Sequence, residues 1–325
     1  MHINATYNAL TPGFLVACRG FLLTTLIVLF GTGCASTNQG VDVDQLVQGS
    51  VEQLIEQGLQ NERQGNYPKA LLLYYNAAKI EPNADLWKRI ARIQFKLGDD
   101  YQALSALGNV TIIKPDDAQS LEALGLMYLK LKHKNQAEEA LIRAVELDVS
   151  RWKAYNGLGI IADLDREHAL AVYRYQTALK IQPESTALLN NLGYSRFLAN
   201  TPEQAADDLI EALRKDRSNK TAWNNLGMVF ARQGRYMDAF EILEHNYPEA
   251  IAYHDVGYVA LINGDWATAE AYLTKALTAS PRYFEEAYIN REAARNRLAG
   301  STQGSIVVRK GAANPYTICF EEFSC

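Results

Sequence analysis

Residues 223–227 read Trp-Asn-Asn-Leu-Gly, and the glycine that ends this stretch belongs to a regular series along the chain. A small residue recurs at Gly58, Ala91, Gly125, Gly159, Gly193, Gly227 and Gly257. The intervals are 33 residues, then 34 residues four times, then 30 residues. An alanine follows each of these residues by 12 positions, at Ala70, Ala103, Ala137, Ala171, Ala205, Ala239 and Ala269. A fixed period near 34 residues indicates an array of one repeated supersecondary unit.

Each unit also has a large apolar position, a second small position and, in four units, a closing proline. The large residues are Tyr74, Leu107, Leu141, Tyr175, Leu209, Leu243 and Leu273; the second small position holds Ala77, Val110, Ala144, Ala178, Ala212, Asn246 and Ala276; the prolines are Pro82, Pro115, Pro183 and Pro281. We expect the small residues to let the two helices of one hairpin approach closely. The large residues should fill the gap towards the neighbouring hairpin, because stacking supplies the stability of such arrays. Gly65, Gly98, Gly234 and Gly264 stand where the first helix of a unit must end and turn.

These spacings resemble the tetratricopeptide repeat, whose pattern W-x2-L-G-x2-Y matches Trp223 to Gly227 and Leu124-Gly125 with Tyr128. The resemblance spans residues 51–283 and implies an all-α, right-handed α-solenoid of about seven helical hairpins. The expected units are 51–83, 84–117, 118–151, 152–185, 186–219, 220–249 and 250–283, followed by a capping helix at 284–299 and an irregular tail at 300–325. Unit six lacks four residues near Pro248, which predicts a kink or a changed stacking angle before unit seven.

The N-terminus has the layout of an export signal. Residues 21–30 read FLLTTLIVLF after Arg19, and small residues lead to Cys34. Ten residues are too few to cross a hydrocarbon core of roughly 30 Å, so we expect a signal peptide over 1–33. An uncleaved anchor extending back to Gly13 is the alternative. The segment before Cys34 resembles a bacterial lipobox, which implies a lipid-anchored Cys34, a flexible tether over 34–50 and a place in the outer membrane facing the periplasm.

The tetratricopeptide resemblance implies an inner groove lined by the first helix of each unit. Projected onto this chain, the groove contains Asn156, Asn190, Asn191, Tyr194, Phe197, Asn224, Asn225, Met228, His254 and Tyr258. Asparagine amides both donate and accept, so a row of them can pair with an extended peptide of any sequence. The alternative is that these asparagines serve local packing within the repeat. A basic stretch at Lys88, Arg89, Arg92 and Lys96 is either a solvated face or a contact for acidic partners or lipid headgroups.

Composition and motifs argue against other classes of function. The formal net charge is -5 with 21% charged residues, and no basic stripe typical of a nucleic-acid binder is present. No nucleophile elbow, phosphate loop or paired metal-binding histidines occur, so we predict neither an enzyme nor a cofactor nor a metal site. Ser305–Val308 could form a short strand. Cys319 and Cys325 either form a disulfide, remain free thiols or pair with a partner.

Export signal, lipobox-like cysteine, tether and repeat together resemble the outer-membrane lipoproteins of pilus biogenesis. The resemblance is to the TadD type of the Flp (tight adherence) pilus, which is related in build to PilF and PilW of the type IV pilus. It implies pilus-assembly or secretin proteins as partners, or another extended peptide segment. Two alternatives stay open: an envelope adaptor for peptidoglycan hydrolases or outer-membrane protein insertion, and an uncharacterised envelope enzyme that uses the C-terminal segment.

Overall fold

A computed structural model describes residues 49–307 and 309, and in these residues every regular element is an α-helix, as the sequence predicts. The helices are α1 (Val51–Arg63), α2 (Tyr67–Ile80), α3 (Ala84–Lys96), α4 (Asp100–Ile113), α5 (Ala118–Lys130), α6 (Lys134–Leu147), α7 (Trp152–Leu164), α8 (His168–Ile181), α9 (Thr186–Leu198), α10 (Pro202–Lys215), α11 (Lys220–Arg232), α12 (Tyr236–Glu244), α13 (Glu249–Asn263), α14 (Trp266–Ala279) and α15 (Glu285–Leu298). The interpretations of Cys34, Cys319 and Cys325 fall outside the described residues.

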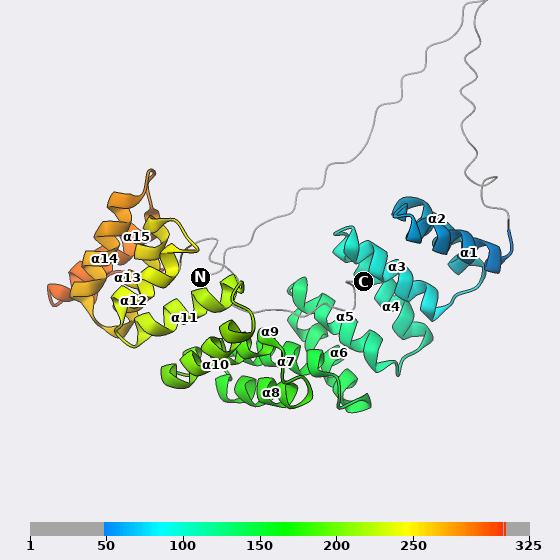
Figure 1. Ribbon diagram of the computed structural model, residues 1–325, viewed down its shortest axis with the longest axis horizontal. Helices are drawn as coiled ribbons and strands as arrows, with labels where there is room; N and C mark the ends of the chain where they lie inside the picture. Colours follow the sequence, from blue (N-terminus) through cyan, green and yellow to red (C-terminus); the bar gives the residue numbers. More distant parts are fainter. Residues whose placement is uncertain (1–48, 308, 310–325) are drawn as a thin grey trace, which may run out of the picture. The chain divides into compact units, whose positions relative to one another are not determined.

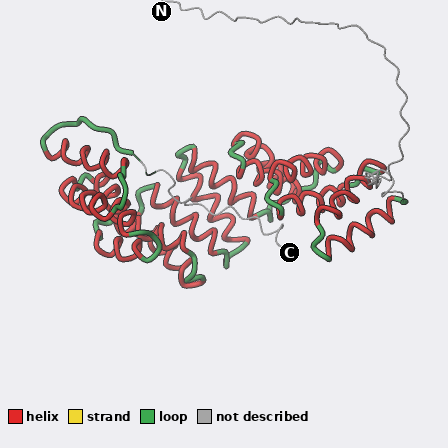
Figure 2. The backbone as a smooth tube through the Cα atoms, turned by 90° about the horizontal axis from the view of Figure 1, so that it is seen from above, coloured by secondary structure: helices red, strands yellow, loops and turns green. Residues whose placement is uncertain are grey.

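The helices pair in chain order and the pairs stack into a solenoid (Figures 1 and 2). Each odd-numbered helix packs against the even-numbered helix that follows it, from α1 with α2 to α13 with α14. From α5 onward each odd-numbered helix also contacts the next odd-numbered one, and Figure 1 shows α7 and α9 on the inner side of the curve, above α8 and α10. The odd-numbered helices therefore line the inner surface of the stack.

The recurring glycines lie where the two helices of a hairpin cross. A Cβ atom at Gly193 would lie 2.7 Å from Leu209 Cγ, and one at Gly257 would lie 2.8 Å from Leu273 Cγ. The large residue thus fills the space left by the glycine of its own hairpin. Leu141 also reaches the next hairpin, where a Cβ at Gly157 would lie 2.7 Å from it. Small and large side chains are complementary within and between units, which is the close packing that holds a protein interior together.

Each inner helix ends on a residue with positive φ. Glycine fills this place at Gly65, Gly98, Gly234 and Gly264, with φ between 74° and 80°, so the predicted turning role of these glycines is confirmed. The same place is taken by Lys132, Arg166 and Asn200, with φ between 60° and 64°. Gly300, with φ of 81°, ends α15 in the same way. By this criterion α15 is the inner helix of an eighth, incomplete unit.

The short sixth unit differs from the others in its outer helix. α12 has 9 residues, whereas the other even-numbered helices have 14. It ends at Glu244, and Pro248 then stands immediately before α13. The four missing residues are therefore one turn of the outer helix, and the proline marks the break that its ring imposes.

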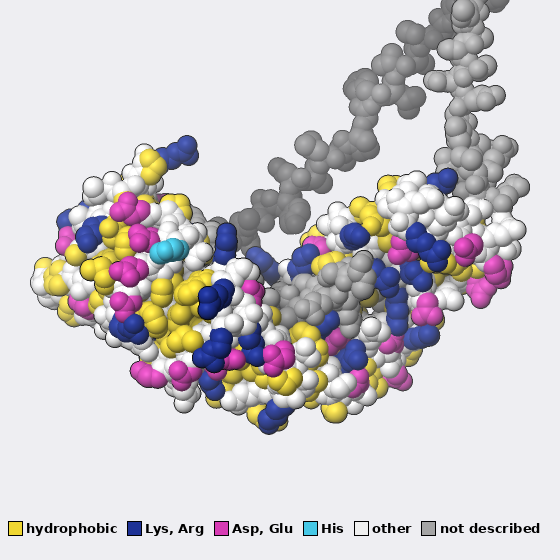
Figure 3. Space-filling model, viewed as in Figure 1, with side chains coloured by type: hydrophobic (Ala, Val, Ile, Leu, Met, Phe, Trp, Pro, Cys, Tyr) yellow, Lys and Arg dark blue, Asp and Glu magenta, His cyan; other side chains and the backbone are white. Residues whose placement is uncertain are grey.

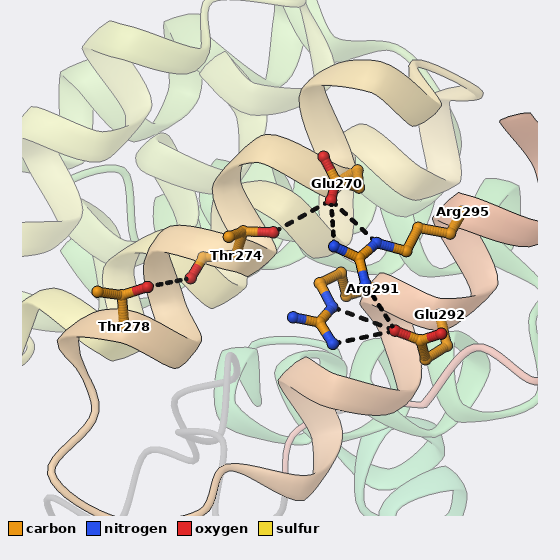
Figure 4. A network of polar contacts seen from close by, with 6 residues as sticks. All are labelled: Glu270, Thr274, Thr278, Arg291, Glu292 and Arg295. Atoms are coloured by element: carbon orange, nitrogen blue, oxygen red, sulfur yellow. Dashed lines mark hydrogen bonds and ion pairs between the residues drawn. The ribbon is translucent and has the colours of Figure 1, made fainter.

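The last helix, α15, packs on α14 through buried Ala287, Ala293 and Ala294. Figure 4 shows the polar contacts at this junction: Arg295 donates from Nε and Nη2 to Glu270 Oε1 at 3.0 and 2.9 Å, and Thr274 donates to the same oxygen. Glu292 accepts from both Arg291 and Arg295. These ion pairs are partly exposed and contribute roughly 1 kcal/mol or less each, so the buried alanines provide most of the attachment.

Residues 301–307 contain no strand, so the expected strand at Ser305–Val308 is wrong for the part of it that the structure describes. The main chain of Val307 pairs with a side chain of α15 instead of a neighbouring strand. Among the described helices none is both long and apolar enough to cross a membrane.

Candidate protein-binding surface

The predicted groove residues lie on the inner helices α7, α9, α11 and α13. Asn156, Asn190, Asn224 and His254 each precede the recurring glycine of their unit by three residues and form what we call the inner row. Residues three and four positions apart share a helix face. Tyr194, Met228 and Tyr258 each follow an inner-row residue by four positions, so they extend the same face by one turn.

Four asparagines of the predicted groove form a hydrogen-bonded chain between helices. Asn191 Nδ2 donates to Asn156 Oδ1 at 2.8 Å, joining α9 to α7. Asn225 Nδ2 donates to Asn190 Oδ1 at 2.9 Å, joining α11 to α9, and Asn190 donates to Asn191 at 3.1 Å. All four side chains are buried. The structure brings the predicted residues together, but it uses their amides to lock the helices, as the packing alternative expected; pairing with a peptide stays a prediction.

Asn224 differs from its neighbours in the inner row. It is half-buried, and its Oδ1 has no solvent contact and no hydrogen-bond donor within the described residues. An unsatisfied buried acceptor costs roughly 1–3 kcal/mol, so a ligand N–H placed there would gain more than at an exposed amide. Asn224 is therefore the inner-row residue best placed to receive a peptide N–H.

Aromatic side chains border the inner row. The rings of Tyr194 and Phe197 in α9 lie 5.9 Å apart and both are half-buried. Burial raises the pKa of Tyr194 to about 12, and the charges of Asp163 and Tyr258 add to this effect. Tyr258 is also half-buried, and burial raises its pKa too. Both phenols therefore stay neutral at physiological pH and present an apolar ring with one polar end, a type of side chain enriched at protein interfaces.

A buried polar cluster around Asp163 was not predicted from the sequence. Its carboxylate accepts from Ser195 at 3.0 Å and from Tyr175 at 3.3 Å, and it lies 2.8 Å from His168 Nδ1. Burial raises the pKa of Asp163, although its hydrogen bonds with His168 and Ser195 act in the opposite direction. Ser195 donates to the carboxylate and not to the histidine, so the three residues do not form a nucleophile–base relay.

The other end of the inner row also contains residues that the sequence reading missed. His254 is buried; its Nδ1 lies 2.9 Å from Asp255 Oδ1, and its Nε2 lies 3.3 Å from Asn290 Nδ2 in α15. Asn290 precedes Ala293 by three residues, and Ala293 precedes Gly300 by seven, the same spacings that place His254, Gly257 and Gly264. The repeat register therefore predicts Asn290 as the next inner-row residue, once it is continued past Pro281.

The basic stretch of α3 is largely paired within the protein. Arg89 and Arg92 lie 3.4 and 3.9 Å from the carboxylate of Glu62, and Lys88 pairs with Asp117. These pairs favour the solvated-face alternative over a site for anionic ligands. Across residues 49–307, no group of three or more His, Cys, Asp and Glu side chains is arranged to hold a metal ion.

A second concave feature lies between α11 and α12. This cleft, of about 630 Å³, is lined by Arg217, Ser218, Lys220, Trp223, Glu241, Ile242, His245 and Asn246. Figure 3 shows hydrophobic side chains gathered on the visible face over α11 to α13, beside Lys and Arg side chains. Shortening of α12 before His245 contributes to this opening.

Comparison with known proteins places the fold. Residues 122–186 and 190–244 match the model of the tetratricopeptide repeat family. A solved tetratricopeptide repeat protein from Parabacteroides merdae superposes with a TM-score of 0.56 at 15% identity, covering 76% of this chain and 99% of that one.

Two curated relatives show similarity in sequence. The BBSome complex member BBS4 of Bos taurus is 25% identical over 261 residues, covering 68% of this chain and 50% of the relative. The type IV pilus assembly protein PilF of Pseudomonas aeruginosa is 31% identical over 125 residues, covering 37% of this chain and 49% of the relative. The chain thus spans about half the length of these relatives. With its paired helices and repeating glycine contacts, the protein is an all-α tetratricopeptide-repeat solenoid, a scaffold for binding other proteins.

Proposed function

We propose that this protein is a membrane-tethered interaction scaffold, an outer-membrane lipoprotein that assists assembly of a Flp- or type IV-like pilus or of its secretin. The inner surface supports the binding role, because Asn224 has an unmet acceptor and half-buried aromatic rings lie nearby. The pilus role is supported by the 31% identity with the type IV pilus assembly protein PilF. That similarity is the single observation that favours a pilus over other envelope machines.

The tether part of the proposal depends on Cys34, which follows an apolar segment and small residues. Acyl chains contribute about 0.8 kcal/mol per buried methylene, so two or more chains hold a protein stably on a membrane. The substitution Cys34→Ser should move the protein from the membrane fraction to the soluble periplasmic fraction, and Cys18→Ser serves as the matched control that should leave it bound. Membrane retention of Cys34→Ser would contradict the lipoprotein assignment.

The partner part can be tested with the purified secretin and pilus-assembly proteins encoded in the same genome. We expect one of them to bind the full chain in calorimetry, and Asn224→Ala to weaken that binding. Asn190→Ala combined with Asn224→Ala should weaken it further without lowering helicity by circular dichroism. Asn76→Ala in the outer helix α2 is the control and should leave the affinity unchanged. Equal affinity of Asn224→Ala and the wild type would remove the inner row from the proposal.

An envelope adaptor for peptidoglycan hydrolases or outer-membrane protein insertion is the alternative, and the inner surface suits it equally well. Binding of a purified hydrolase, with no binding of secretin or pilus proteins, would favour that alternative. For an envelope enzyme the described residues offer no support, because the Asp163 cluster lacks a serine–histidine hydrogen bond.

A further inference from the structure

The chain turns back over α15 after this helix ends. Gly300 and Gly304 have φ of 81° and 104°, a region in which only glycine is unstrained. At Gly304 the main chain passes so close to α15 that a Cβ atom would lie 3.2 Å from Ala293 Cα. Residues 301–307 therefore lie against α15 itself.

One inner-row asparagine binds the main chain of this returning segment. Asn290 Oδ1 accepts from the Val307 N–H at 2.8 Å, and Asn290 Nδ2 donates to the Val307 carbonyl at 2.8 Å. Asn290 is fully buried. The pair of bonds involves only the main chain of Val307, so this mode of recognition is independent of the side chain bound.

Two residues further, the chain has reached the preceding inner helix. Arg309 donates from Nε and Nη2 to the two carboxylate oxygens of Asp255 in α13, at 3.3 and 3.2 Å. Both side chains are mostly buried, and the guanidinium lies 5.8 Å from the ring centre of Tyr247. Burial alone would raise the pKa of Asp255, but its hydrogen bonds with His254 and Arg309 lower it, so the carboxylate is charged. The segment thus runs from α15 to α13, towards α11.

We propose that residues 310–325 continue in this direction and occupy the inner row over α11, α9 and α7 as an intramolecular ligand. This inference rests on the proposed function, because it assigns the same surface. The next inner-row residue after His254 is Asn224, whose Oδ1 has no hydrogen-bond donor within the described residues. It receives a main-chain N–H of the segment, as Asn290 receives that of Val307.

The segment is long enough and complementary in charge. Crossing from α13 to α7 takes three inter-helix steps of about 10 Å each, whereas 16 residues reach up to about 50 Å. The segment contains Tyr316, Phe320 and Phe323, which suit the aromatic border of the inner row, and an acidic pair, Glu321-Glu322. Lys153 in α7 precedes Asn156 by three residues on the same face and supplies the opposite charge.

A ligand joined to its own binding site competes at an effective concentration in the millimolar range. A partner that binds the inner row must therefore displace residues 310–325. The surface is open only to partners that bind more tightly than this segment or that bind the segment itself.

Hydrogen–deuterium exchange on the full chain carrying Cys34→Ser tests the proposal. Amides of residues 310–325 should exchange about tenfold more slowly than in a synthetic peptide of the same sequence free in solution. Lys153→Glu should bring exchange close to that of the free peptide, and adding Glu321→Lys with Glu322→Lys should restore protection. Lys180→Glu on the outer helix α8 is the matched control and should change nothing.

Exchange of wild-type residues 310–325 at the rate of the free peptide would overturn the proposal. Protection that grows with protein concentration would also overturn it, because it would show that a second copy supplies the segment. A protected segment with no binding of secretin, pilus or hydrolase proteins would sink the proposed function and leave this inference standing. An unprotected segment with Asn224-dependent partner binding would do the reverse.

Discussion

Gly193 in α9 and Leu209 in α10 are in such close contact that a single added methyl group cannot be accommodated without movement. A Cβ atom at Gly193 would lie 2.7 Å from Leu209 Cγ and 3.1 Å from the carbonyl oxygen of Ala205. The same contact recurs between Gly125 and Leu141. These contacts join the two helices of a hairpin, so they set how closely each unit packs.

The substitution Gly193→Ala should lower the free energy of unfolding by about 1–3 kcal/mol, because overpacking outweighs the gain in helix propensity. Gly108→Ala in α4 is the matched control, since nothing lies within 4 Å of its added Cβ. That variant should raise the free energy of unfolding by about 0.5–1 kcal/mol. Urea unfolding monitored by circular dichroism measures both, and destabilisation of both variants alike would contradict the close-approach argument.

The positive-φ residues at the ends of inner helices provide a second test. Lys132 is exposed and has a φ of 64°, a conformation that costs a side-chain-bearing residue roughly 1–2 kcal/mol. Lys132→Gly removes this strain but increases the entropy of the unfolded chain, so we expect a net gain of about 0.5–1 kcal/mol. Gly98→Ala should have the opposite effect. Thermal unfolding of the two variants must shift in opposite directions if the helix ends are as described.

Stability should depend on pH through Asp208. Burial raises the pKa of Asp208 to about 6, although Arg196, at 2.6 Å, acts in the opposite direction. A raised pKa in the folded state favours the protonated form, so this contribution is fully present below pH 4 and is lost as the pH rises through about 6. The loss is at most roughly 3 kcal/mol. Asp208→Asn should flatten the fall in unfolding free energy between pH 4 and pH 7; an unchanged pH slope would rule this carboxyl out.

The asparagine chain between inner helices should contribute to stability independently of any ligand. Asn191→Ala removes the donor to Asn156 Oδ1 and the acceptor for Asn190 Nδ2. We expect a loss of about 1–3 kcal/mol in unfolding free energy, because buried polar groups lose their partners. Asn76→Ala, outside this chain, should cost less than 1 kcal/mol. Similar values for the two variants would show that the inter-helix amides are not coupled.

Much of the fold was predictable because its determinants repeat in the sequence. The Gly193 series, the following alanines and the glycines after the inner helices each report a requirement of one hairpin, which depends on residues close in the chain. The same register, continued to Gly300, predicts Asn290 as an inner-row residue. Lys132, Arg166 and Asn200 were not recognisable as turn residues, because neighbouring contacts impose a conformation that these residues disfavour.

The sequence by itself determined the repeat length, the helix pairs, the close glycine contacts and the face on which the asparagines lie, because period and residue size follow from helix geometry. Only the tertiary structure decided what those side chains bind. Asn191 pairs with Asn156, Asp163 collects Ser195 and His168, and Asn290 holds Val307. These partners come from different helices or from the returning chain, so the stacking of units, and not any local pattern, selects them.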